Sequence, residues 1–285
     1  MPAMTARSDI APDGIAFAKM HGLGNDFVVL DQRVAPVPLH AALIRAIGDR
    51  RRGVGFDQLA EILPGSDADI DLVFWNSDGS TAGACGNATR CIAEQILTEH
   101  RSNEISLRTE RGRLTARRRP DGVVEVNMGA PMLDWASIPL REDMDSVSLP
   151  IQGDPAACSM GNPHCTFFVD DADAVDLAGR GAAIERHDLF PERTNVQFVQ
   201  VLSPNRARVR VWERGVGVTL ASGSSSCAVL VNAHRRGLME RQATLLLDGG
   251  EIEITWADNG DVLMAGPTTH VFTGRFSPEW IAANS

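Results

Sequence analysis

The sequence predicts an α/β (α+β) fold made of two similar halves. Four residues of the first half are each matched by a related residue 137 positions later. The pairs are Asn25 with Asn162, Gln58 with Asn195, Asn76 with Glu213, and Cys85 with Ser222. Strand-like and helix-like stretches also alternate along the chain. Amides and a thiol/hydroxyl pair make poor cores, so we expect these pairs to form the two walls of one site.

The strand-like stretches are short, and several alternate apolar with polar residues. They cover residues 27–31, 70–75, 123–127, 165–169, 195–202, 207–212, 243–247 and 251–256. The helix-like stretches are 38–49, about 87–99 and about 224–236. The sequence Asn-Met-Gly-Ala-Pro at 127–131 is the best linker candidate, since glycine and proline interrupt regular structure.

Cys85 and Ser222 each stand between an alanine and a glycine, directly before a predicted helix. The positive end of a helix lowers the pKa of a thiol there, and its free N–H groups can hold a carboxylate. Two facing helix ends would therefore clamp a carboxylate with one proton-transfer group on each side. That arrangement suits inversion of a carbon alpha to a carboxylate.

The α-proton of an amino acid is normally acidified by a pyridoxal cofactor on a lysine Schiff base. Lys19 is the only lysine, and it lies in a segment that looks like the start of a strand. We therefore predict a reaction without a cofactor. The five cysteines have neither zinc-type nor disulfide-framework spacing, so we expect no metal and a reducing, cytoplasmic location.

Six ordered motifs between Phe17 and Phe276 resemble those of diaminopimelate epimerases. They are Lys19–Phe27, Gly55–Gln58, Asn76–Ser80, Cys85–Asn87, Met160–Cys165 and Glu213–Gly217. The resemblance implies two similar domains, each with mixed or antiparallel strands around a central helix, with the active site in the cleft between them. It also implies a homodimer that interconverts LL- and meso-2,6-diaminopimelate, without cofactor or metal, on the route to lysine and peptidoglycan.

The resemblance also assigns roles to individual residues. It implies that Cys85 and Ser222 occupy the two acid/base positions, and that His164 and Glu213 assist proton transfer. The residues that it implies bind the amino acid are Asn25, Gln58, Asn76, Gly86, Asn87, Asn162, Asn195, Glu213, Arg214, Gly223 and Ser224.

The chain departs from the family pattern at Ser222, where the family has its second catalytic cysteine. A hydroxyl is a far weaker acid than a thiol, so Ser222 needs strong activation to act as a base. The serine is either an engineered substitution or a natural divergence, and two further replacements of family glycines, Ser225 and Ala88, favour divergence. A diverged site could epimerise slowly or racemise a different amino acid. It could also dehydrate a β-hydroxy amino acid, or bind an amino acid without turnover.

The composition of the chain indicates that its binding partner is a small molecule. The net charge of −10 argues against a nucleic acid or a membrane surface, and no apolar run approaches the roughly 20 residues that span a bilayer. Residues 1–14 are polar, lack a secretory signal and predict a flexible extension. We expect one domain over 15–129, completed by about 273–285, and a second over 130–272.

Overall fold

The structure, a computed structural model, describes residues 13–284, so the predicted extension lies almost wholly outside the described residues. The helices are α1 Ala41–Gly48, α2 Gly86–His100, α3 Leu177–Glu185, α4 Gly223–Arg235 and α5 Pro278–Asn284. The strands are β1 Ile15–Gly22, β2 Asn25–Asp31, β3 Gln58–Pro64, β4 Ile70–Asn76, β5 Thr81–Ala82, β6 Glu104–Thr109, β7 Gly112–Arg118, β8 Val124–Asn127, β9 Ala156–Ser159, β10 Pro163–Phe168, β11 Asn195–Ser203, β12 Arg206–Glu213, β13 Gly217–Thr219, β14 Gln242–Leu247, β15 Gly250–Trp256, β16 Val262–Gly266 and β17 Thr269–Phe276.

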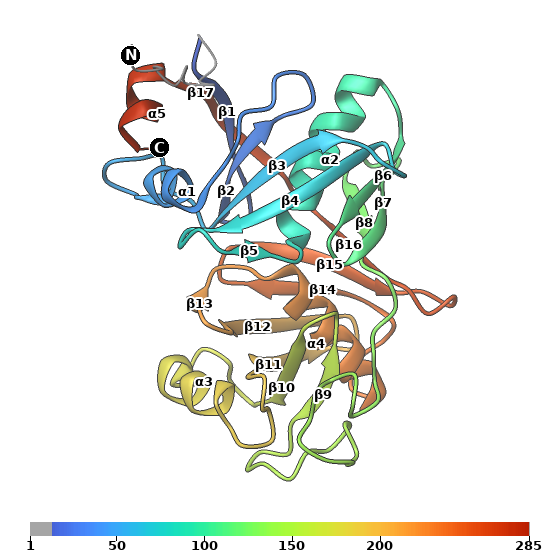
Figure 1. The fold of residues 1–285 in the computed structure, drawn as a ribbon. Coiled ribbons are helices and arrows are strands. Elements are labelled where there is room, and N and C mark those ends of the chain that lie inside the picture. Colours follow the sequence, from blue (N-terminus) through green and yellow to red (C-terminus); the bar gives the residue numbers. More distant parts are fainter. Residues whose placement is uncertain (1–12, 285) are drawn as a thin grey trace, which may run out of the picture.

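The predicted duplication of the fold is confirmed element by element. The series β2, β3, β4, β5, α2, β6, β7 and β8 recurs in the same order as β10, β11, β12, β13, α4, β14, β15 and β16. The helices α1 and α3 also correspond. Figure 1 shows the first series in the upper part of the view and the second in the lower part. The interval found in the polar residues is thus the interval of the whole fold.

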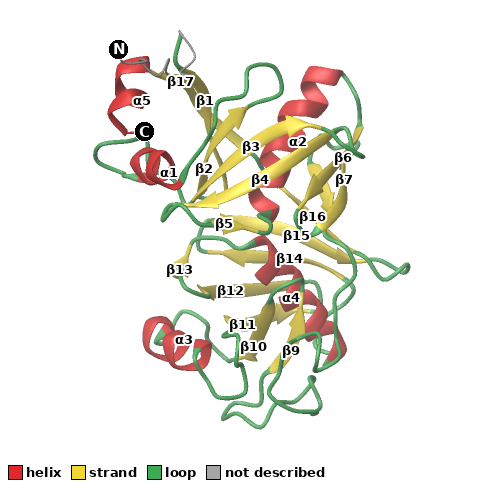
Figure 2. Ribbon diagram, in the orientation of Figure 1, coloured by secondary structure: helices red, strands yellow, loops and turns green. Residues whose placement is uncertain are grey.

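The strands pair in one continuous order around the two central helices. From β17 the pairing runs through β1, β2, β3, β4, β6, β7 and β8, and then through β16, β15, β14, β12, β11 and β10 to β9. The antiparallel pair of β8 with β16 joins the halves. Figure 2 shows α2 and α4 among the strands, with α1, α3 and α5 on the outside.

Each central helix is buried by the strands of its own half. In α2, Cys91, Ile92 and Ile96 are fully buried in one apolar cluster. In α4, Cys227 and Leu230 are fully buried in another. A helix with apolar residues on most sides must lie inside a protein, which explains why strands surround both. None of the helices in the described range 13–284 is both long and apolar enough to cross a membrane.

The predicted helix over 38–49 begins later, at Ala41. His40 is the N-cap, with extended backbone angles, and its ring Nδ1 accepts the N–H of Leu43 at 3.3 Å. The capping side chain satisfies an N–H that has no partner inside the helix, and so fixes the helix start after His40. The proline-containing segment before His40 therefore lies outside the helix.

The last strand and helix return to the first half. β17 pairs antiparallel with β1, and Phe276 and Ile281 are buried with Phe17 in the cluster beneath α1. Figure 1 shows α5 beside α1, far from the second half.

The halves meet where the N-termini of α2 and α4 approach each other. A β-carbon added at Gly223 would lie 3.6 Å from the Cα of Gly86 and only 2.9 Å from the Sδ of Met264. One added at Gly86 would lie 3.0 Å from the terminal methyl groups of both Met264 and Met128. A side chain at either helix start would therefore displace the side chain of Met264, which forms a wedge between them.

We expect Met264→Ala to lower the free energy of unfolding by about 2 to 5 kcal/mol, because Met264 is fully buried and the cavity would lie at the junction of the halves. Urea unfolding would measure this loss. The control is Met132→Ala, since Met132 is 39% exposed. Equal shifts for the two variants would show that the wedge does not stabilise the junction.

Candidate active site at the meeting of two helices

Six of the predicted site residues lie at the ends of strands that point toward the two helix starts. These residues are Asn25, Gln58 and Asn195, which begin β2, β3 and β11, Asn76 and Glu213, which end β4 and β12, and Asn162, which directly precedes β10. Strand ends have unpaired positions and room for polar side chains. The parallel pairing of β2 with β3, and of β10 with β11, brings the beginnings of the paired strands together. The structure thereby collects residues far apart in sequence around Gly86 and Gly223.

Cys85 is the N-cap of α2. Its Sγ accepts the N–H of Ala88 at 3.5 Å and lies 3.9 Å from the Oδ1 of Asn25. The same oxygen accepts the side-chain N–H of Asn87 at 3.2 Å, while Asn25 donates to Asp57 at 3.0 Å. These bonds fix the Asn25 side chain with its oxygen toward the thiol.

The expected fall in the pKa of Cys85 is wrong. Burial raises the pKa of the Cys85 thiol to about 12, and the negative charge of Glu213 raises it further. The N–H groups of Ala88 and Asn87 lower it, but by less than burial raises it. Withdrawal from water outweighs the positive helix end here, so the resting residue is a thiol.

Ser222 caps α4 at the position equivalent to Cys85, yet its hydroxyl makes no capping bond. The hydroxyl instead hydrogen-bonds the carboxyl of Glu213, which also accepts from Thr219 at 2.8 Å. Burial raises the pKa of Glu213 to about 7, and both hydrogen bonds act against that rise. A carboxyl that titrates near neutral pH therefore lies directly beside Ser222.

His164 is fully buried and neutral. Burial, together with the positive charges of Arg111 and Arg214, lowers its pKa to about 3. Because the side-chain N–H of Gln197 meets His164 Nδ1 at 3.1 Å, the proton resides on Nε2, which lies 3.0 Å from Asn162 Oδ1. In this state the histidine orients Asn162.

Four further predicted substrate-binding side chains bind other parts of the protein. Gln58 donates to Asn76 at 3.5 Å, and Asn76 donates to Ser80 at 3.0 Å. Asn195 donates to the carbonyl of Pro163 at 2.9 Å and accepts the main-chain N–H of Arg214 at 3.0 Å. Asn195 therefore also sets the place of Arg214. In the same half, Asn162 lies 3.5 Å from the hydroxyl of Ser224.

The sequence reasoning missed Arg90, which is fully buried and forms no ion pair among residues 13–284. Its guanidinium donates to Asn87 at 3.1 Å and to the carbonyl of Pro267. Burial lowers the pKa of Arg90. The spacing of Asn87 and Arg90 by three residues on a helix was a signal for this contact, whereas nothing in the sequence pointed to Thr219 or Gln197.

The ammonium of Lys19, the only lysine, is bound by other residues and so does not offer a free amine for a Schiff base. Its ammonium forms an ion pair with Asp26 and donates to the carbonyl of Gly55 at 2.6 Å. Within the described range 13–284 the structure contains no group of three or more His, Cys, Asp or Glu that could hold a metal ion.

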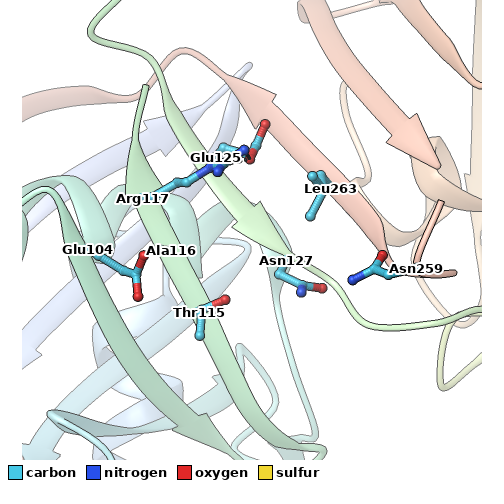
Figure 3. Close-up of a pocket in the computed structure, with 8 residues that line it drawn as sticks. All are labelled: Glu104, Thr115, Ala116, Arg117, Glu125, Asn127, Asn259 and Leu263. Carbon is cyan, nitrogen blue, oxygen red and sulfur yellow. Dashed lines mark hydrogen bonds and ion pairs between the residues drawn. The ribbon is translucent and has the colours of Figure 1, made fainter. Parts of the chain in front are cut away.

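A separate cavity of about 240 Å³ lies on β7, β8 and β16 (Figure 3). Its lining residues are Glu104, Thr115, Ala116, Arg117, Glu125, Asn127, Asn259 and Leu263. Arg117 and Glu125 form an ion pair at 2.7 Å across it. None of the predicted site residues lines this cavity, so it is not the candidate active site.

Comparison with known proteins identifies the family that this chain resembles. The family model described as diaminopimelate epimerase matches residues 17–133 and 156–271. The chain is 50% identical over 271 residues to a diaminopimelate epimerase of Acidiphilium cryptum, covering 93% of this chain and 98% of that one. It is 51% identical over 267 residues to one from Rhodospirillum centenum, covering 92% of each.

Solved structures with the same fold are more distant. A phenazine biosynthesis protein of Bacillus anthracis matches with a TM-score of 0.67 at 14% identity, over 92% of this chain and 98% of that one. A hydroxyproline epimerase of Agrobacterium vitis matches with a TM-score of 0.67 at 14% identity, over 93% of this chain and 91% of that one. At this identity the likeness shows the fold alone.

The duplicated fold and the relatives together define an isomerase of the racemase and epimerase class that acts on amino acids. The family motifs cover nearly the whole chain, as the family model does. The chain belongs to the diaminopimelate epimerase family.

The raised pKa of Glu213 predicts a pH-dependent loss of stability. The fold disfavours the charged carboxylate, so stability falls as pH rises from the usual pKa of 4.5 through about 7. We expect Glu213→Gln to be more stable than the unaltered protein at pH 8 by about 1 to 3 kcal/mol, and equal to it at pH 4.

Urea unfolding at both pH values would test this expectation. Glu240→Gln, which alters an exposed carboxyl, controls for the loss of one charge. A Glu213→Gln difference of the same size at pH 4 and pH 8 would contradict the argument, because ionisation would then play no part.

Proposed function

We propose that this chain interconverts LL- and meso-2,6-diaminopimelate, with Cys85 on one face of the α-carbon and Ser222 on the other. The observation that carries the proposal is the approach of the α2 and α4 N-termini at Gly86 and Gly223, because it gives Cys85 and Ser222 equivalent places. The identity of about 50% to enzymes named diaminopimelate epimerase supports this substrate and a role in lysine biosynthesis.

The helix starts would hold the carboxylate next to the reacting carbon. First-turn N–H groups have no partner within a helix, and two such ends offer them to one anion from both sides. Asn25, Asn76 and Asn162 lie around these ends and would bind the rest of the amino acid. A bound carboxylate also acidifies the α-proton less than a Schiff base does, so the enclosed, preorganised donors must stabilise the developing carbanion.

On the first face, the Cys85 thiol would first pass its proton to Glu213, and the resulting thiolate would take the α-proton, leaving the electron pair on the substrate carbon. On the second face the Ser222 hydroxyl would donate its proton to that carbon, and protonated Glu213 would restore it through their hydrogen bond. In the reverse direction Glu213 would accept the Ser222 proton while Ser222 takes the α-proton. Glu213 thus supplies the activation that a hydroxyl requires.

The ion pair of Lys19 with Asp26 supports a reaction that does not use a lysine Schiff base. A homodimer and a cytoplasmic location stay predictions, as do the boundaries of the two domains.

Proton NMR with LL-diaminopimelate in deuterated water tests the proposal. We expect the α-proton signal to disappear and the meso isomer to accumulate by chiral analysis. Cys85→Ala should slow the exchange by about 100-fold or more, since it removes a general base. Cys91→Ala, which removes a thiol buried in the core, is the matched control. Exchange that survives Cys85→Ala would contradict the role of Cys85.

Ser222→Cys tests the second face. A thiol is the stronger acid and base, so we expect faster epimerisation by about 10-fold or more. In the unaltered protein, one epimer presents its α-proton to Cys85 and the other presents it to Ser222. The α-proton of the first epimer should exchange with solvent faster than that of the second. If Ser222→Cys does not epimerise faster, and the protein releases a keto acid and ammonia from a β-hydroxy amino acid, the result would instead favour a dehydratase.

A further inference from the structure

A line of buried hydrogen bonds runs through the core of the second half and ends at the candidate active site. Its inner members are Thr166, Gln197 and Asn232, and it reaches His164; all four side chains are fully buried. Gln197 also donates to the hydroxyl of Ser225, in the first turn of α4, at 3.1 Å. Polar groups are costly to bury unless each one finds a partner, so a core needs a reason to contain such a set.

The first half does without these polar groups. At the corresponding places, 137 positions earlier, it has apolar residues that belong to one buried cluster. They are Phe27 for His164, Val29 for Thr166, Ala60 for Gln197 and Ala88 for Ser225. The fold therefore does not require polar side chains here. The hydrogen bonds serve something specific to the second half, which is the half whose central helix is capped by serine.

The direction of the hydrogen bonds is set at the end far from the site. Arg235 donates to Asn232 Oδ1 at 3.3 Å, and a guanidinium can only donate. The amide of Asn232 is thereby oriented, and its Nδ2 donates to the Thr166 hydroxyl at 3.0 Å. That hydroxyl in turn donates to Gln197 Oε1 at 3.0 Å. Gln197 therefore presents its N–H groups, and not its oxygen, to His164 Nδ1.

The same direction continues to the cleft. Because Nδ1 of His164 accepts, Nε2 carries the ring proton and donates to Asn162 Oδ1 at 3.0 Å. Arg111 donates to the same oxygen at 3.5 Å. With its oxygen held by two donors, Asn162 turns its Nδ2 to the hydroxyl of Ser224, in the first turn of α4, at 3.5 Å.

We propose that Gln197 is a positioning residue, which holds His164 as a hydrogen-bond donor and so turns the N–H groups of Asn162 toward the start of α4. Arg235 sets this direction from the far side of the core. The proposal rests on the proposed function and deepens it, because it gives His164 a fixed donor role in place of proton transfer. An anionic group of the amino acid at this helix start then meets the N–H groups of Asn162, whereas the reverse direction would present the amide oxygen.

Proton–nitrogen correlation NMR of histidine side chains tests the direction without requiring turnover, because the two neutral forms of the ring give different patterns. The His164 signals are those that disappear in His164→Gln. We expect the Nε2–H form in the unaltered protein. Asn232→Asp replaces an N–H donor by an oxygen that can only accept, and Arg235 beside it keeps the new carboxylate charged.

The substitution Asn232→Asp should reverse the whole line of hydrogen bonds. The Thr166 hydroxyl would donate to the new carboxylate, the Gln197 amide would turn over, and His164 would change to the Nδ1–H form. Asn205→Asp makes the same change of charge at an exposed residue and should leave the ring in the Nε2–H form. An Nε2–H form that persists in Asn232→Asp would overturn the proposal, because the direction would then not depend on Asn232.

Calorimetric binding of LL-diaminopimelate links the ring form to the ligand. We expect Asn232→Asp to raise Kd about 10-fold, the usual effect of losing a hydrogen bond to a charged group. A reversed ring form with an unchanged Kd would overturn the positioning role. If the ring form reverses and Kd rises, but the unaltered protein does not exchange the α-proton of diaminopimelate, the proposed function fails while the role of Gln197 stands.

A second pair of variants keeps the proposal open to test if Asn232→Asp does not fold. Thr166→Ser retains the hydroxyl and should keep the Nε2–H form. Thr166→Val removes the hydroxyl, so the Gln197 amide is free to turn over and His164 should populate both forms. A pure Nε2–H form in Thr166→Val would overturn the proposal.

Discussion

The approach of two helix N-termini at Gly86 and Gly223 is the constraint on which the rest of the structure depends. Both helices begin with glycine, and a side chain at either position would displace Met264, whose sulfur fills the space behind. Everything else follows from holding these ends together: strands surround each helix, and β8 and β16 join the two sets of strands. The duplication thus has a physical purpose, because one helix end offers donors on one side only, and two offer them on both.

The groups of the resulting cleft are partly or fully buried, and this burial determines their charge. Cys85 is a thiol, His164 is neutral and Glu213 titrates near pH 7, all because burial disfavours the charged forms. Permanent charges near the site include the arginine guanidinium groups, which keep their proton in proteins, and the carboxylate of Asp57 beside Asn25. The positive charges of Arg111 and Arg214 act on His164, while Glu213 can exchange a proton near pH 7.

The sequence was sufficient for the duplication and the α/β class, because residues repeated at a constant interval carry that information directly. It was not sufficient for charge states. The helix end beside Cys85 was visible in the sequence, but the degree of burial that overrides it was not. Contacts across the cleft were equally hidden, since Arg111 has a partner in the other half and no sequence spacing relates them. The strands β3, β6 and β7 were missed individually, although their counterparts β11, β14 and β15 were found.

The return of β17 to β1 bears on the order in which the chain can mature during synthesis. The second half has all of its strands once β16 has left the ribosome, whereas the core beneath α1 still lacks Phe276 and Ile281. The half that is made first is thus completed last. Until then its edge strand β1 remains open to other chains, and a nascent polypeptide stalled before β17 would present that edge to its neighbours.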